Sequence, residues 1–255
     1  MIYITTNTKG GVGKSTFMAQ IASAYILRNS SSVRLIEIDD ENKDCVTFAK
    51  SDSLKTEMLS TSKISSLDEL FIEEEGEDVL LDIGGNKTST IFLQEVKKLG
   101  EFENVIWFIP LRSGEQDNQN ALDTYYRITD MDKEANIIFV LSDVRSDDLE
   151  YEFLYFFGNK FLKTPMAIMG QDFQVNYIVI KSSPIINISR SFNKTIRDIS
   201  QGDIDFKEEA KKTKDRDLRR KYLFLNRVKN EAIEYMTYLE SSVFNELDRL
   251  LLKGD

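Results

Sequence analysis

The sequence predicts an α/β protein built on a doubly wound, mostly parallel sheet with helices on both faces. Short apolar runs alternate with stretches whose apolar residues recur every three or four positions. This alternation is typical of strands and helices that follow one another in a parallel sheet. A glycine-rich stretch comes directly after the first apolar run. The chain has 255 residues, of which 41% are hydrophobic, enough for a sizeable buried core.

Five apolar runs predict the main strands, at residues 2–6, 33–38, 77–83, 104–109 and 136–142. Two weaker strand signals follow, PMAIM at 165–169 and YIVI at 177–180. The helical spacing predicts helices over 15–28, 88–99 and 116–130, and a short one in SSLDELF, residues 65–71. That short helix lies in a polar, serine-rich connection between the second and third strands.

The composition excludes several classes of protein. There is no histidine and one cysteine, Cys45, which excludes a disulfide framework, a Cys/His zinc site and a histidine general base. The beginning of the chain has neither a basic segment nor a long apolar run, so we expect no signal peptide and no transmembrane helix. We therefore expect a cytoplasmic protein.

The glycine-rich stretch, TTNTKGGVGKSTF at 5–17, is a candidate phosphate-binding loop. The strict pattern, G-x-x-x-x-G-K-[ST], requires glycine at position 8, where this chain has Thr8. A strand before the loop and a helix after it provide the context that a phosphate site needs. Backbone N–H groups and the helix dipole would then face the phosphates. We expect Lys14 to reach the β- and γ-phosphates and Ser15 to ligate Mg²⁺.

The run KGGVGKST, residues 9–16, resembles the deviant Walker A motif of the ParA/MinD family of ATPases, and most closely that of small plasmid partition proteins. The resemblance implies ATP and Mg²⁺ as ligands and an ATP-dependent homodimer. It also implies that Lys9 is the signature lysine, which reaches the nucleotide of the other subunit. The nucleotide-binding residues that it implies are Gly10, Gly11, Val12, Gly13, Lys14, Ser15 and Thr16.

Two acidic motifs extend the resemblance. The second strand ends LIEIDDEN, in which Asp39 takes the place of the family's water-orienting aspartate. Asp40 and Glu41 stand where relatives have Pro-Gln, which leaves the shape of this switch open. Lys9, Lys14 and Asp39 are therefore the candidate catalytic residues.

The third strand ends VLLDIGGNK, in which Asp82 corresponds to a Walker B carboxylate that holds Mg²⁺ through water. Gly85 then falls where a backbone N–H senses the γ-phosphate. Relatives often carry Asp-x-Pro-Pro here, so Gly84 and Gly85 predict a looser switch. The guanine-binding pattern N-K-x-D is absent after the late strands.

The last 53 residues differ in charge from the rest. Residues 206–230 contain ten Lys/Arg and four Asp/Glu, a net charge of +6 in a chain of net charge −10. We therefore expect an ATPase domain over 1–202 and a helical extension over 203–255. On one helix, Lys212, Arg216, Arg219 and Arg220 would lie near one face and contact DNA phosphates without reading sequence. A solvated helix with pairs such as Glu208–Lys212 is the alternative.

The final stretch carries apolar residues at helical spacing, namely Ile233, Met236, Leu239, Val243, Leu247 and Leu250. Its polar side is acidic, unlike the basic membrane tails of MinD-type proteins. We therefore expect it to pack on the domain or on a partner subunit, and we expect no membrane attachment.

The leading hypothesis is a ParA-like ATPase that hydrolyses ATP slowly, associates with the nucleoid in its ATP form, and segregates plasmid DNA or positions a cargo with a ParB-like or centromere-binding adaptor. A membrane-cycling MinD-like regulator and an accessory ATPase of conjugation are the alternatives.

Overall fold

A parallel sheet forms the centre of the computed structural model, which describes residues 1–40, 45–67, 78–100, 104–161 and 167–251. Its strand order is β3-β2-β4-β1-β5-β6-β7, and every neighbouring pair runs parallel. The strands are β1 Ile2–Thr5, β2 Val33–Ile38, β3 Leu54–Leu59, β4 Val79–Ile83, β5 Val105–Leu111, β6 Asn136–Val144 and β7 Asn176–Lys181.

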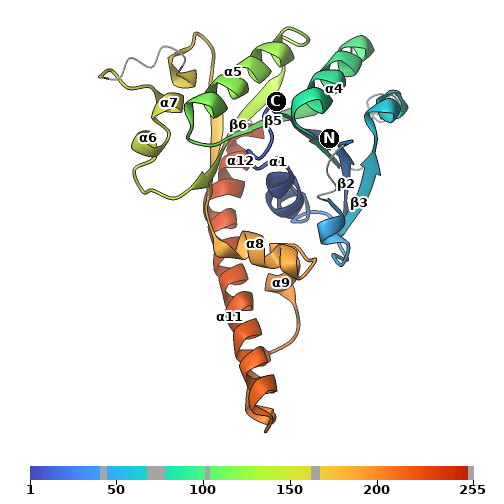
Figure 1. Ribbon diagram of the computed structural model, residues 1–255, viewed down its shortest axis with the longest axis vertical. Helices are drawn as coiled ribbons and strands as arrows, with labels where there is room; N and C mark the ends of the chain where they lie inside the picture. The colour runs from blue at the N-terminus through green and yellow to red at the C-terminus, as the bar shows by residue number, and fades with distance from the viewer. Residues whose placement is uncertain (41–44, 68–77, 101–103, 162–166, 252–255) are drawn as a thin grey trace.

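Helices cover both faces of the sheet (Figure 1). On one face lie a helix made of α1 Lys14–Thr16, η1 Phe17–Ala22 and α2 Ser23–Ile26, then α8 Pro184–Ser191, α9 Ile196–Gln201 and a long C-terminal helix. On the other face lie α4 Asn86–Leu99, α5 Glu115–Thr129, α6 Leu149–Glu152, α7 Leu154–Phe157 and the 3₁₀ turn η4 Ile168–Gly170. Two further 3₁₀ turns, η2 Cys45–Phe48 and η3 Thr61–Leu67, flank β3.

The central strands are apolar throughout because both of their faces are buried. Neighbouring residues of one strand enter opposite cores: Tyr3 packs with the α1–α2 layer, and Ile4 with the α4–α5 layer. Both side chains are buried. A parallel sheet covered on both sides requires such continuous apolar runs.

The long C-terminal helix is continuous through α11 Arg216–Tyr238, the wider π-helical turn η5 Leu239–Phe244 and α12 Asn245–Leu251. Its second half is part of the core, where Leu239, Val243 and Leu247 are buried with strand residues. Arg28 donates hydrogen bonds of 3.0 and 2.6 Å to the two carboxylate oxygens of Asp248. This bidentate pair joins the end of the long helix to the turn that follows α2.

The first half of α11 extends beyond the rest of the molecule (Figure 1). The short helix α10 Phe206–Lys212 packs against it, and the Phe206 and Tyr222 rings stack with their centroids 6.3 Å apart. We call residues 206–227 the basic hairpin. Among the described helices, none has both the length and the apolar composition that crossing a bilayer requires.

The fold class, the five main strands and the three longer helices are confirmed. The strand signal YIVI is also confirmed, since it lies in β7. The sequence analysis missed β3, which lies in the stretch interpreted as a polar connection. This strand lies at the open edge of the sheet, its three central residues Lys55, Thr56 and Glu57 are polar, and only Leu54 is buried.

Two weaker predictions were wrong. The described part of PMAIM, residues 167–169, leads into the 3₁₀ turn η4 and forms no strand. Lys212 and Arg216 do not share a helix, because α10 ends at Lys212 and α11 begins at Arg216. Asp215 caps α11 by accepting hydrogen bonds from the N–H groups of Asp217 and Leu218, and a cap of this kind starts a new helix.

Two expectations of the sequence analysis are left without an outcome. SSLDELF overlaps η3 at 65–67, and its remaining residues lie outside the described ranges. The boundary at 202/203 stays a prediction.

The packing of the C-terminal helix predicts unequal effects of two leucine truncations. Leu239 is fully buried, whereas Leu223 on the same helix is 52% exposed. Leu239→Ala should lower the free energy of unfolding by about 2–5 kcal/mol because it leaves a cavity in the core. Leu223→Ala should change it by less than about 0.5 kcal/mol. Urea denaturation of both variants measures the difference, and equal small effects would show that the helix does not share the core.

Candidate functional site

The glycine-rich loop lies at the carboxyl edge of the sheet, between β1 and α1. β1 is central, with Thr5 in register with Asp82 of β4 and with Phe108 of β5. In open α/β sheets, ligands bind outside the carboxyl ends of the strands. The loop that leaves β1 is therefore flanked by the ends of β4 and β5.

Asn7 fixes the path of the loop, a role that the sequence analysis did not assign. Its buried side chain donates a 2.7 Å hydrogen bond to the Pro110 carbonyl and accepts a 2.9 Å hydrogen bond from the Lys9 N–H. On the other side, the Asn86 N–H donates to the Thr8 carbonyl at 2.7 Å. The loop is thus held between the ends of β5 and β4. No motif identifies Asn7, because its partner Pro110 lies 103 residues further along the chain.

Glycines are needed where the loop turns into the helix. Gly11 and Gly13 have φ values of 74° and 103°, in the left-handed region that L side chains rarely adopt. A Cβ at Gly13 would also lie 3.2 Å from the Ser142 hydroxyl. The helix then begins at Lys14, with Ser15 and Thr16 in its first turn, where unpaired N–H groups and the dipole attract anions.

Lys14 is buried, and its ammonium folds back on the loop. It donates hydrogen bonds to the carbonyls of Lys9, at 3.1 Å, and of Asn7, at 3.5 Å. Burial lowers the pKa of the Lys14 ammonium, while the charges of Asp82 and Asp39 act in the opposite direction. A buried cation that faces an edge of the sheet is well suited to bind an anion, because bound phosphate oxygens would replace the two carbonyls as its partners.

Asp82 and Asp39 lie on neighbouring strand ends beside Lys14. Asp82 is a buried residue of β4 in register with Glu37 of β2, and Asp39 follows β2 directly. The described residues contain no cluster of three or more acidic or cysteine side chains able to hold a metal by themselves. One carboxylate with a nearby serine hydroxyl fits Mg²⁺, which keeps several waters and takes its other ligands from phosphates.

Gly84 and Gly85 allow the segment after β4 to lie close to the segment after β2 and to the glycine-rich loop. A Cβ on Gly84 would lie 2.7 Å from the Asp39 carboxylate carbon, and one on Gly85 would lie 3.0 Å from the Gly10 backbone nitrogen. Gly85 also precedes α4 as its N-terminal cap residue. These glycines bring the chain after Asp82 into contact with both the phosphate loop and Asp39.

Lys9 is held within its own chain. Its ammonium lies 2.8 Å from a carboxylate oxygen of Asp117, in the first turn of α5. Asp117 is 108 residues away in the sequence, and the two residues meet because β1 and β5 are neighbours. The sequence analysis did not assign Asp117 to the site.

The four candidate DNA-contacting residues lie far from this site, on the basic hairpin, and all four are exposed. Lys212 pairs with Glu209 at 2.8 Å and Arg220 with Asp217 at 3.5 Å. Arg219 donates a hydrogen bond to the Thr213 carbonyl at 2.8 Å. The structure therefore gathers Lys9–Thr16, Asp39, Asp82 and Gly85 at one edge of the sheet and places the basic residues elsewhere.

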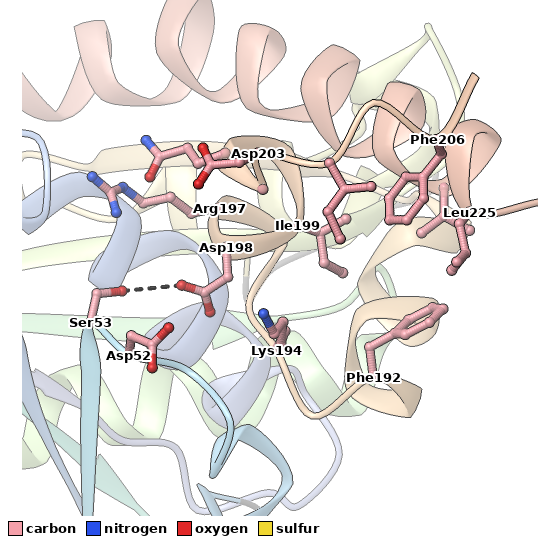
Figure 2. Close-up of a pocket in the computed structure, with 14 residues that line it drawn as sticks. Asp52, Ser53, Phe192, Lys194, Arg197, Asp198, Ile199, Asp203, Phe206 and Leu225 are labelled. Atoms are coloured by element: carbon pink, nitrogen blue, oxygen red, sulfur yellow. Dashed lines mark hydrogen bonds between the residues drawn. The ribbon is translucent and has the colours of Figure 1, made fainter. Parts of the chain in front are cut away.

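A separate cavity of about 590 Å³ opens at the base of the basic hairpin (Figure 2). Its lining is mixed: it includes Phe192, Phe206 and Leu225 together with Lys194 and Asp52. Ser53 donates a 3.2 Å hydrogen bond to Asp198 at its rim. Among the described residues, none from the glycine-rich loop lines this cavity.

Comparison with solved structures identifies the fold. The chain superposes on MinD, a cell division protein from Aquifex aeolicus, with a TM-score of 0.53 and 14% identity, over 92% of this chain and 96% of that one. A chain of the MinC:MinD cell division protein complex of the same organism gives a TM-score of 0.53 and 15% identity, over 76% of this chain and 86% of that one. A MinD from Pyrococcus horikoshii, complexed with Mg-ADP, gives 0.48 and 12%, over 88% and 93%.

The sequence matches no family model and no curated protein. What the comparisons show is the fold, which is similar to that of the two structures from Aquifex aeolicus.

The contact between Gly85 and the phosphate loop predicts a difference between two glycine substitutions. Gly85→Ala should lower the free energy of unfolding by about 1–3 kcal/mol, because the added methyl meets the Gly10 backbone, which cannot move aside cheaply. Gly10→Ala is the matched control, since a Cβ there meets nothing within 4 Å. Urea denaturation measures both, and a neutral Gly85→Ala would contradict this packing.

Proposed function

We propose that the chain is a ParA/MinD-type positioning ATPase that binds Mg-ATP in the loop from Lys9 to Thr16. One observation carries the proposal. A complete glycine-rich loop leaves the central strand of a MinD-like sheet and places a buried lysine beside two carboxylates. The same loop is linked by hydrogen bonds to the ends of β4 and β5.

Each residue of the site has a proposed role. The N–H groups from Gly10 to Thr16 bind the phosphates, and Lys14 exchanges its carbonyl partners for β- and γ-phosphate oxygens. Ser15 and Asp82 hold Mg²⁺, which neutralises charge on the phosphates. Asp39 orients the attacking water, and the Gly85 N–H contacts the γ-phosphate. Because the described residues offer no histidine or other strong general base near Asp39, we expect slow turnover.

We propose that Lys9 acts between two subunits. In the isolated chain Asp117 holds its ammonium. When two ATP-loaded faces meet, a free Lys9 offsets the repulsion between their triphosphates and contacts the partner's nucleotide. The ion pair with Asp117 then competes with dimerisation, because we expect the ammonium to leave Asp117 in order to reach the nucleotide of the other subunit.

We propose that the ATP-bound dimer binds DNA without sequence preference through the basic hairpin. The basic hairpin, residues 206–227, contains nine Lys/Arg and four Asp/Glu, so two hairpins would present twice its net charge of +5. The cycle would segregate plasmid DNA or position a cargo in the cytoplasm, on the nucleoid, with a ParB-like or centromere-binding adaptor that stimulates hydrolysis. Liposome sedimentation with and without ATP separates this cycle from membrane cycling.

The competition at Lys9 predicts the effect of removing its partner. Asp117→Asn should tighten ATP-dependent dimerisation by about two- to fivefold, since an ion pair at this exposure contributes up to about 1 kcal/mol. Sedimentation equilibrium with a non-hydrolysable ATP analogue measures the dimer dissociation constant. Asp123→Asn, an exposed position on the same helix, is the control. Weaker dimerisation of Asp117→Asn would show instead that Asp117 supports the interface.

DNA binding is tested with random-sequence duplex and no nucleotide, ADP or ATP, across a salt series. We expect binding with ATP only. Lys212→Ala combined with Arg220→Ala should reduce the slope of log affinity against log salt by about two per subunit, because each residue neutralises about one phosphate. Lys55→Ala, an exposed lysine on the edge strand β3, should leave the slope unchanged. Equal or absent binding in all three nucleotide states would contradict the proposal.

A further inference from the structure

The outer face of α11 is lined by exposed side chains, although Arg219 on this face donates a hydrogen bond to the Thr213 carbonyl. Val228, Ala232 and Tyr235 of this helix turn towards the core. At 100° per residue, Leu223 and Ile233 lie five residues before and after Val228, about 140° around the helix on either side. They are 52% and 43% exposed. Two large apolar side chains thus stand on the side of the helix that faces solvent.

Polar neighbours of the two apolar residues are also exposed on this outer face. Arg216 and Arg219 precede Leu223, and Glu234 and Thr237 follow Ile233. Among the described residues, Arg216 and Glu234 form no ion pair within the chain. Their charges are therefore available to a partner.

Charge is segregated along the helix. Residues 216–229 contain six Lys/Arg and one Asp, whereas residues 231–251 contain five Asp/Glu and one Arg. The helix dipole does not favour this order, since it attracts acids to the N-terminal turn and bases to the C-terminal turn. The arrangement does not stabilise the isolated helix. On the outer face, the exposed Arg216 and Arg219 belong to the basic half and the exposed Glu234 to the acidic half.

We propose that α11 pairs with α11 of a second copy, antiparallel and through this outer face. An antiparallel arrangement places the positive half of each helix on the negative half of the other and repeats that contact by twofold symmetry. It also brings Leu223 of each copy near Ile233 of the other. A parallel arrangement would instead oppose like charges. The half of α11 that extends beyond the molecule (Figure 1) would then lie along the partner's anchored half.

This pairing is independent of the proposed nucleotide cycle. No residue of α11 belongs to the phosphate-loop site, so the second copy should bind without nucleotide. The pair covers Arg216 and Arg219, which we also propose as DNA contacts. DNA and the second copy therefore compete for this face, and the pair is the form that does not bind DNA through these residues.

Sedimentation equilibrium of the full chain, without nucleotide and with a chelator, tests the pairing. We expect a dimer at low salt that weakens as salt rises, because exposed charges drive it. Arg216→Glu/Arg219→Glu should weaken the dimer by at least about tenfold, since the two changes act twice across a symmetric interface. Glu231→Lys/Glu234→Lys should weaken it by a similar factor.

Mixing the two charge-reversed variants tests whether the two helices pair antiparallel. At positions 216, 219, 231 and 234 one variant carries only Glu and the other only Arg or Lys, so an equimolar mixture should form a mixed dimer. A wild-type monomer under these conditions, or variants that dimerise like the wild type, would overturn the proposal. Monomeric variants that fail to form the mixed dimer would overturn the antiparallel arrangement. Because Glu231→Lys/Glu234→Lys alters none of the proposed DNA contacts, its ATP-dependent DNA binding reports separately on the proposed function.

Discussion

Burial of the Lys14 ammonium is the constraint around which the site is arranged. A cation taken out of water needs partners, and here two loop carbonyls supply them while Asp82 and Asp39 lie close enough to oppose the loss of its proton. The loop must therefore turn tightly enough for its carbonyl oxygens to accept hydrogen bonds from the Lys14 ammonium. Left-handed glycines make that turn possible, and Asn7 holds the strand end from which it starts. A triphosphate would satisfy the same ammonium better, because it brings negative charge as well as hydrogen-bond acceptors.

The sheet topology explains why residues far apart in sequence meet at this lysine. β1 lies between β4 and β5, so the segments after both strands reach the loop from opposite sides. Gly84 and Gly85 bring the β4 side within contact of Asp39 and Gly10, and α5 brings Asp117 to Lys9. A change in the conformation of the loop would therefore affect both the segment after β4 and the first turn of α5. The long C-terminal helix packs against the α1–α2 side of the sheet through Leu239, and the Arg28–Asp248 pair connects it to the turn after α2.

Much of this architecture follows from local sequence. The strands that are buried on both faces are unbroken apolar runs, and the glycine-rich loop is one contiguous stretch, so the positions of both could be predicted without a structure. The edge strand β3 could not, because an exposed edge imposes no apolar run. Asn7 and Asp117 were missed for a different reason. Their roles depend on Pro110 and Lys9, partners that only the neighbouring positions of β1 and β5 bring within reach. The break between α10 and α11 depends on Asp215, which caps α11. Counting basic residues along the sequence does not reveal this cap.

A crystal structure with Mg²⁺ and a non-hydrolysable ATP analogue would test the central claim most directly. We expect the Lys14 ammonium to leave the carbonyls of Lys9 and Asn7 and to contact the terminal phosphates, with Ser15 and Asp82 facing the metal. A nucleotide bound elsewhere, for example in the cavity at the base of the basic hairpin, would contradict the account. So would a nucleotide in the loop with Lys14 still hydrogen-bonded to the two carbonyls.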